Sequence, residues 1–387
     1  MSVDLLPPLS LYVHLPWCVR KCPYCDFNSH AARGDVPEER YVDALLADLA
    51  IDAALIGARE IQTVFMGGGT PSLFRAESIA RLLTGIRARV GLANDAEITL
   101  EANPGTVELD RFRGFREAGI NRLSIGIQSF DEEKLKALGR IHGRAESLAA
   151  ADAARAAGFE NVNLDLMYGL PQQGAEQARA DVATAIAREP THISAYQLTL
   201  EPNTPFYRNP PSLPDEHVLD AIQNAVDTTL ANHGYQQYEV SAYARAGNEC
   251  RHNRNYWEFG DYLGIGAGAH AKISGADRVT RIAKTRHPDA YLRDVGTVGV
   301  RTEVRDLARD DLIGEFMLNA LRLHDGFSAE LFTARTGLSL DAIDAPRRAA
   351  QARGLLTDDG DYLSPTALGR RFLNDLIVLF LPEQQRP

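Results

Sequence analysis

The sequence predicts an α/β fold, with a partial (βα)6 barrel followed by a mainly helical, winged-helix-like C-terminal domain. Two observations predict the barrel: short apolar runs alternate with helical patterns, and polar or glycine-rich residues follow strand after strand. Six such units imply a parallel sheet with right-handed crossovers, and they are too few for a closed eight-fold barrel. The expected strands are 9–15, 62–65, 97–101, 122–127, 161–166 and 192–198, and the expected helices are 37–56, 77–90, 108–118, 145–157 and 175–187.

Three regions are expected along the chain. The barrel is assigned to residues 1–240, a connecting segment to 241–305 and the C-terminal domain to 306–387. A helix over 215–233 and a strand over 235–241 are expected at the end of the barrel region.

The C-terminal domain has the element order of a winged-helix module. Its expected elements are helices over 306–323, 329–336 and 340–353, then a hairpin over 354–363. Residues 327–387 contain seven Arg, no Lys and eight acidic residues, so a capping or partner-docking role is favoured over DNA binding.

The composition is that of an ordinary globular protein. The chain has 387 residues, of which 45% are hydrophobic and 24% are charged, and its net charge is -11. This charge argues against a nucleic-acid-binding face. The sequence shows no signal peptide and no apolar run of membrane-spanning length, and three of its four cysteines are clustered. We therefore expect a cytoplasmic protein without a membrane span.

Three cysteines stand directly after the first predicted strand, as Cys18, Cys22 and Cys25 at C-x3-C-x2-C spacing. Thiolates suit iron–sulfur clusters, and a 4Fe-4S cluster held by three of them leaves one iron open to a small molecule. A zinc site would need a fourth ligand such as His14 or His30, and a disulfide would leave one thiol unpaired. The spacing favours the cluster.

Further polar motifs follow the next strands. In Gly67–Ser72 the glycines allow backbone N–H groups to approach an anionic ligand, although a tight turn would use the same residues. Glu101 ends the third strand, where it can accept hydrogen bonds from a ligand. Asp165 lies in an otherwise apolar strand, so we expect it to be partnered by a ligand or by Arg140. His142 is expected to make a structural hydrogen bond.

The cysteine spacing resembles the signature of the radical S-adenosylmethionine (SAM) superfamily. The motifs G-G-G-T-P-S, E-A-N-P-G-T, S-I-G-I-Q-S-F, L-G-R-x-H and D-L-M-x-G-L-P, in this order, resemble the coproporphyrinogen-III-oxidase-like branch and, within it, the HemW-type haem chaperones. This resemblance implies a 4Fe-4S cluster on the three cysteines, SAM and haem as bound groups, and a haem-acceptor protein such as a respiratory enzyme as partner. It implies SAM contacts at Tyr12, Gly68, Gly69, Thr70, Glu101, Gln128, Arg140 and Asp165.

One departure distinguishes the two branches that the chain resembles. Oxygen-independent coproporphyrinogen III dehydrogenases have a fourth cysteine two residues after the third, where this chain has Phe27. Only eight residues precede the first expected strand, whereas a long N-terminal extension is usual in the dehydrogenases. Both features favour the chaperone over the dehydrogenase, which is the alternative.

A second motif, His-Asn-x-x-Tyr-Trp, lies within Cys250–Trp257. Haem iron accepts an imidazole ligand and aromatic rings cover a porphyrin plane, so the resemblance makes His252 the first haem ligand to test, beside Tyr256 and Trp257. Alternatively, His252 fixes a turn and Trp257 is buried in the core. Cys250 is expected to be a buried small hydrophobe. The sequence leaves open whether SAM is cleaved and whether two copies associate.

Overall fold

The computed structural model describes residues 6–105, 109–275 and 277–382, and its centre is one curved sheet with the strand order β14-β13-β12-β11-β1-β4-β5-β6-β7-β8-β10-β9. Seven neighbouring strands are parallel: β11 (Asp261–Ile265), β1 (Leu9–Leu15), β4 (Glu60–Gly68), β5 (Gly91–Ala102), β6 (Arg122–Gln128), β7 (Asn161–Tyr168) and β8 (His192–Gln197). The sheet has two unjoined edges, so the barrel is partial, as predicted.

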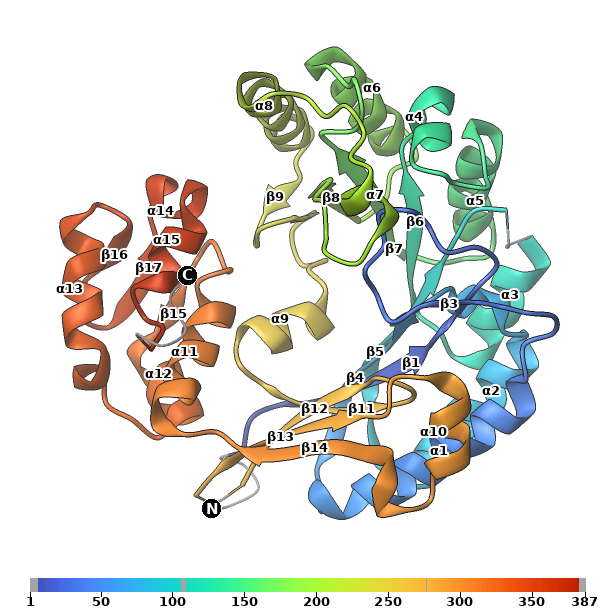
Figure 1. Cartoon of the computed structure of the whole chain (residues 1–387), viewed down its shortest axis with the longest axis horizontal. Helices are drawn as coiled ribbons and strands as arrows, with labels where there is room; N and C mark the ends of the chain where they lie inside the picture. Colours follow the sequence, from blue (N-terminus) through green and yellow to red (C-terminus); the bar gives the residue numbers. More distant parts are fainter. Residues whose placement is uncertain (1–5, 106–108, 276, 383–387) are drawn as a thin grey trace.

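Helices cover the convex side of this sheet (Figure 1). One main helix follows each of the six expected strands: α1 (Glu38–Asp52), α2 (Ala76–Arg87), α3 (Leu109–Ala118), α5 (Arg144–Ala156), α6 (Ala175–Ile186) and α8 (Glu216–Asn232). Two shorter helices, α4 (Glu132–Ala137) and α7 (Pro205–Arg208), lie in the connections. Because helices cover the sheet, strands such as β1 are almost completely buried and contain long apolar runs. The prediction of six βα units is confirmed.

The segment after the barrel helices extends the same sheet. β11 pairs in parallel with β1, from Leu9 opposite Asp261 to Val13 opposite Ile265. Antiparallel strands continue the sheet beyond it: β12 (His270–Ser274), β13 (Val279–Lys284) and β14 (Arg301–Asp306), with α10 (Pro288–Asp294) in the last connection. Part of the region that we expected to be a connecting segment is therefore sheet, while the domain boundaries at 240 and 305 stay a prediction.

The opposite edge of the sheet is formed by two very short strands. β10 (Ala242–Ala244) pairs antiparallel with β8, and β9 (Gln236–Gln237) pairs with β10. The predicted strand over 235–241 was therefore wrong in length. The sequence pattern of this stretch predicted an extended backbone, but only two of its residues form hydrogen-bonded strand pairs with a neighbouring strand.

Buried charges fasten the extension to the barrel. Asp261 on β11 binds Arg59 and Lys272, with N–O distances of 2.8 and 2.9 Å. Lys284 on β13 contacts Asp48 and Asp52 of α1 in a fully buried ion-pair group. Because an unpaired charge in such surroundings is costly, these contacts fix how the extension packs on α1.

The C-terminal module has its own apolar core around Phe316 and Phe332. It comprises α11 (Arg309–Ala320), α12 (Ala329–Thr336), α13 (Asp344–Ala352), α14 (Ala367–Arg371), α15 (Leu373–Val378) and a three-stranded sheet of β15 (Phe327–Ser328), β17 (Tyr362–Pro365) and β16 (Leu356–Asp358). This mainly helical domain agrees with the prediction. Glu315 joins it to the extension by accepting from Arg281 at 2.8 Å.

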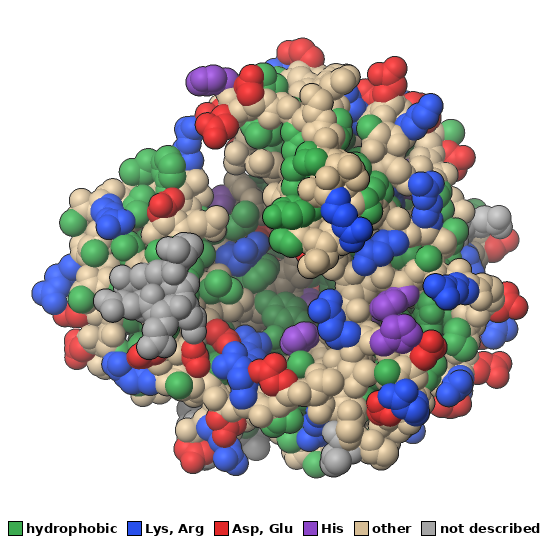
Figure 2. All heavy atoms as spheres, viewed as in Figure 1, with side chains coloured by type: hydrophobic (Ala, Val, Ile, Leu, Met, Phe, Trp, Pro, Cys, Tyr) green, Lys and Arg blue, Asp and Glu red, His purple; other side chains and the backbone are tan. Residues whose placement is uncertain are grey.

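Between the C-terminal module and the barrel the molecular surface is hollowed, with hydrophobic side chains on the floor of the hollow (Figure 2). The short helix α9 (Arg251–Trp257) lies on the concave side of the sheet, between the two bodies (Figure 1). Within the described ranges, no helix has the length and apolar character needed to cross a membrane.

Candidate functional site

The predicted cysteines open onto a cavity of about 480 Å³ at the carboxyl ends of the barrel strands, which we call the cysteine cavity. Ligands of parallel α/β sheets bind at this edge. Ten of the predicted site residues line it: Cys18, Cys22, Cys25, Gly68, Gly69, Thr70, Glu101, Gln128, Arg140 and Asp165. The structure thus brings together residues from the cysteine loop and from the ends of β4 to β7.

The cysteine loop is closed by two short parallel strands, β2 (Trp17–Cys18) and β3 (His30–Ala31). Backbone hydrogen bonds at the closure, from His30 N to the Pro16 carbonyl (2.7 Å) and from Ala32 N to the Cys18 carbonyl (2.9 Å), hold the loop on the end of β1. Burial raises the pKa of the Cys18 thiol, and the neighbouring cysteines add to this effect while a Thr70 hydrogen bond opposes it. Cys22 and Cys25 therefore act on the Cys18 thiol within one cavity.

The donor set fits a multi-iron group. Among the described residues, no three His, Cys, Asp or Glu side chains converge on a point suited to a single metal ion. A cubane cluster does not need such convergence, because each thiolate binds a different iron. All four cysteines of the chain are free thiols, and the three in the loop are only partly buried.

The glycine segment brings two stretches of backbone into contact. A Cβ on Gly69 would lie 2.6 Å from the Trp17 carbonyl oxygen, so only glycine allows this approach to the cysteine loop. The Gly69 and Thr70 N–H groups donate to the Leu15 and Trp17 carbonyls at 2.8 and 2.7 Å, and Gly68 N–H donates to Glu101 Oε2 at 3.1 Å. The expectation that these N–H groups form an anion-binding concavity is therefore wrong, since protein oxygens already occupy them.

Two partly buried carboxylates, Glu101 and Asp165, face the cysteine cavity. Burial, assisted by the nearby charge of Asp165, raises the pKa of Glu101 to about 8. Burial also raises the pKa of Asp165, although this carboxylate accepts from Asn163 Nδ2 at 2.8 Å and from Ser124 Oγ at 3.0 Å. Neither carboxylate forms an ion pair within the described chain. A cationic ligand would balance the negative charge of both carboxylates.

Arg140 does not partner Asp165, contrary to one of the two alternatives expected from the sequence. Its Nη2 donates to Asn103 Oδ1 at 2.6 Å and to the Gly126 carbonyl at 2.9 Å. Its Nη1 lies 3.5 Å from Cys22 Sγ, so the guanidinium touches the cysteine loop instead. The partners of Asp165 are uncharged: Asn163 on its own strand and Ser124 on the neighbouring strand. Single sequence motifs do not show contacts between strands.

Gln128 has an unusual backbone conformation, and His142 makes a structural hydrogen bond. Gln128 has φ 71°, in the left-handed region that non-glycine residues rarely adopt, at a register shift of the β6–β7 pairing. His142 donates from Nε2 to the Ile127 carbonyl at 3.1 Å, which is the structural hydrogen bond expected for it.

Sequence reasoning missed a polar layer deeper in the barrel. His192 binds Asn163 Oδ1 through Nδ1 at 2.7 Å and Tyr238 Oη through Nε2 at 2.9 Å, and burial lowers its pKa well below the usual range. Arg122 and Ser194 also line the cavity. The sequence did contain a signal for this layer: its polar residues stand two positions apart along each strand, because inward-facing residues alternate along a barrel strand. The inward positions are Arg122, Ser124, Gly126 and Gln128 on β6, Asn163 and Asp165 on β7, and His192, Ser194 and Tyr196 on β8.

Tyr12 lies outside the cysteine cavity. It lines a second pocket of about 360 Å³, which we call the aromatic pocket; its lining consists of Tyr12, His14, Phe27, Asn28, Gly68, Glu101, Tyr256, Tyr262, Gly268 and His270. Phe27, Gly68 and Glu101 line both spaces, so the two cavities are neighbours. The assignment of Tyr12 to SAM stays a prediction.

His252 is buried on α9, with 1% of its surface exposed. Its Nδ1 lies 2.7 Å from Thr63 Oγ1, and its ring packs against Phe65 and Tyr256. Its Nε2 has no hydrogen-bond partner in the described structure, and burial lowers its pKa to about 3. Iron could reach Nε2 only if α9 moved, so haem ligation by His252 stays a prediction that requires this movement. Cys250 is fully buried, as expected.

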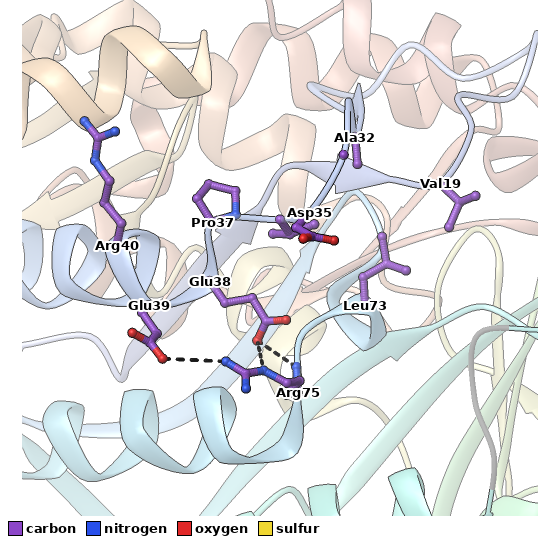
Figure 3. Close-up of a pocket in the computed structure, with 11 residues that line it drawn as sticks. Val19, Ala32, Asp35, Pro37, Glu38, Glu39, Arg40, Leu73 and Arg75 are labelled. Atoms are coloured by element: carbon purple, nitrogen blue, oxygen red, sulfur yellow. Dashed lines mark hydrogen bonds and ion pairs between the residues drawn. The ribbon is translucent and has the colours of Figure 1, made fainter.

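Another hollow, of about 810 Å³, lies on the outer surface behind the cysteine loop (Figure 3). It is lined by Val19 and Leu73 and by the start of α1, and it contains none of the predicted site residues. Three of its charged residues pair with one another, since the Arg75 guanidinium lies 3.5 Å from Glu38 Oε2 and 3.7 Å from Glu39 Oε1.

Two family profiles match the chain. The profile of the Radical SAM superfamily matches residues 12–185, which include the three cysteines. The profile of the HemN C-terminal domain matches residues 307–372, within the C-terminal module.

Full-length relatives are also similar. Heme chaperone HemW of Escherichia coli (strain K12) is 52% identical over 379 residues, which cover 98% of this chain and 99% of the relative. Heme chaperone HemW of Haemophilus influenzae is 48% identical over 384 residues, with coverage of 98% and 99%. Among solved structures, Coproporphyrinogen III oxidase (HemN) from Escherichia coli superposes with a TM-score of 0.84 at 26% identity, covering 98% of this chain and 91% of that one.

Proposed function

Because the chain belongs to the HemW family of radical SAM proteins, we propose that it is a haem chaperone that holds a 4Fe-4S cluster, binds SAM and passes haem to an acceptor protein. The curated relatives are named haem chaperones, and they match this chain from end to end. An acceptor that contains haem, such as a respiratory enzyme, is the partner that this function requires.

The observation that carries the cofactor part is the meeting of three thiols and two carboxylates that form no ion pair among the described residues in one cavity. Cys18, Cys22 and Cys25 would hold the cluster. SAM carries a sulfonium and an ammonium group, so Glu101 and Asp165 are suited to it by charge. When bound, the cluster and SAM together supply one-electron chemistry.

The chain's own residues would position SAM. Gly69 keeps the backbone close to the cysteine loop, and the Gly68 N–H orients the Glu101 carboxylate. Arg140 lies beside Cys22, where its guanidinium offers the charge that a carboxylate group of the ligand needs. Gln128 and Thr70 complete the polar lining.

Anaerobic reconstitution tests this function. Protein supplied with iron and sulfide should bind both in equal amounts, change its absorption spectrum on addition of SAM, and bind one haem per chain. Asp165→Asn should weaken the SAM response about tenfold, since it removes a buried charge, whereas exposed Asp95→Asn serves as the matched control. Zinc in place of iron, or no stoichiometric haem binding, would contradict the proposal.

The structural similarity to HemN supports one alternative, an oxygen-independent coproporphyrinogen III dehydrogenase. At the position where that branch has a fourth cysteine, Phe27 is 62% exposed and lines both cavities. Dithionite-reduced, reconstituted protein given SAM and coproporphyrinogen III should therefore release no carbon dioxide. Release at a catalytic rate would favour the alternative.

A further inference from the structure

The aromatic pocket has the lining of a site for a flat apolar ligand. Tyr12, Tyr256, Tyr262 and Phe27 contribute aromatic rings from four separate segments of the chain. Tyr256 and Tyr262 pack edge to face with ring centroids 4.4 Å apart. Aromatic surfaces of this kind stabilise planar ring systems by burial and by stacking.

Two imidazoles line this pocket, and only one is engaged. His14 is bound on both sides, with Nδ1 3.1 Å from Tyr12 Oη and Nε2 2.9 Å from the Asn28 carbonyl. The His270 ring is exposed at the start of β12 and makes no hydrogen bond or ion pair within the described ranges. Burial, together with the charge of Arg281, lowers the pKa of His270, which keeps the ring neutral and able to bind a metal.

Cationic groups lie beside this free imidazole. The charges of Arg281 and Arg286 both act on His270. Arg281 already donates hydrogen bonds to Glu315 and to Tyr262 Oη. Arg286 is exposed and forms no ion pair in the part of the chain that the structure describes; its Cα lies 3.5 Å from the Cβ position of Gly268. A guanidinium in this position suits a carboxylate of a ligand that reaches out of the pocket.

We propose that haem binds in the aromatic pocket, with the His270 imidazole as axial ligand and the Arg286 guanidinium at a propionate. The inference rests on the haem-carrying function proposed above and gives the haem a site that needs no movement of α9. Tyr256 of the His-Asn-x-x-Tyr-Trp motif then contacts haem, while His252, behind it at a ring distance of 5.0 Å, supports Tyr256. Haem in this pocket would share Phe27, Gly68 and Glu101 with the occupant of the cysteine cavity.

Haem titration of the full chain tests the site, with the absorption spectrum and electron paramagnetic resonance as readouts. His270→Ala should weaken haem binding about tenfold or more and remove the spectral signature of an imidazole ligand. His217→Ala, which removes an exposed histidine of α8, is the matched control. Iron and sulfide content after reconstitution checks that each variant is folded.

A rescue experiment separates ligation from a structural role. In His270→Gly, added imidazole should restore the wild-type spectrum, because free imidazole can occupy the vacated position. Arg286→Gln should weaken binding about two- to fivefold, and Arg353→Gln on the C-terminal module should leave it unchanged.

The outcomes distinguish the site from the function. If the wild-type protein binds no haem, the proposed function itself fails. If the wild-type protein binds haem but His270→Ala keeps both affinity and spectrum, the site is overturned while the haem-carrying function stands. Loss of binding in His270→Gly that imidazole does not restore would also overturn the ligand assignment.

Discussion

The cysteine cavity and the aromatic pocket share three lining residues, Phe27, Gly68 and Glu101, yet they are built differently. The cysteine cavity is formed by polar side chains at the ends of parallel strands, many of which bind one another. The aromatic pocket is lined by residues of β1, β11, β12, α9 and the cysteine loop, including four aromatic rings and one free imidazole. The comparison shows that one fold provides a charged site for a polar cofactor and, beside it, an apolar site for a flat ligand.

The largest expected effect separates the two cavities by removing one metal ligand. Cys18→Ala should lose more than about nine tenths of the reconstituted iron, because a cluster held by two thiolates is unstable. Haem affinity should stay close to wild type, since Cys18 does not line the aromatic pocket. Iron and sulfide analysis beside haem titration gives the measurement, with Cys250→Ala as the control that keeps its cluster. Equal loss of iron in both variants would show that the loop is not the cluster site.

The next effect concerns the packing behind the aromatic pocket. Lys284→Met leaves Asp48 without a cationic partner, while Asp52 keeps Arg301 at 2.6 Å, and it should lower the free energy of unfolding by about 3–5 kcal/mol. Asp48 also accepts from the Gly266 N–H at 3.2 Å, so the turn that leads to the pocket should loosen. Urea unfolding gives the measurement, and exposed Lys136→Met is the control. Equal stabilities would show that this ion-pair group contributes nothing to the fold.

A third change acts on the boundary between the cavities. Gly68 has φ +112°, and a Cβ there would overlap the His14 ring. Gly68→Ala should therefore cost about 1–3 kcal/mol and weaken the binding of both SAM and haem. Gly247→Ala is matched, because Gly247 also has positive φ (+77°) but no atom within 4 Å of its Cβ position. If the two variants lose equal stability, backbone strain alone explains the effect.

A fourth effect is a pH dependence set by Glu101. Its carboxyl is protonated in the folded protein up to a pKa of about 8 but ionises in the unfolded chain near 4.5, so the unfolded state binds fewer protons between these values. The free energy of unfolding of the cofactor-free protein should therefore fall as pH rises through this window, by up to about 1.4 kcal/mol per pH unit from this group.

Glu101→Gln removes this contribution, because the amide does not ionise. Urea unfolding at about pH 5 and about pH 8 should show a smaller loss of stability in the variant than in the wild type. Identical pH dependence in both proteins would mean that Glu101 is already ionised in the folded state.

The parallel barrel was largely predictable from sequence, whereas the extension was not. β1 was predicted with its observed bounds, because a buried parallel strand is a continuous apolar run. β11 carries no comparable signal: its five residues include a buried Asp261 and a glycine. Its partner β1 lies far away in the sequence, near the N-terminus. The buried charge of Asp261 is tolerated only because Arg59 and Lys272 form ion pairs with it.

The same limit applies to the candidate site. The spacing of the cysteines and the polar residues after successive strands predicted a common cavity, because parallel strands bring their carboxyl ends to one edge. The bonds made within the cavity were missed, such as Arg140 to Asn103, because they join different strands.

By itself, the sequence determined the order of strands and helices in the barrel, the three thiols on one loop and the family to which the chain belongs, since these follow from local patterns and short spacings. Only the tertiary structure decided that Tyr12 lines the aromatic pocket and not the cysteine cavity. It also decided that His252 is buried and that the His270 ring makes no hydrogen bond within the described residues. The physical reason is that exposure and partnership depend on which distant segments pack together, and the pairing of β11 with β1 brings those segments to the aromatic pocket.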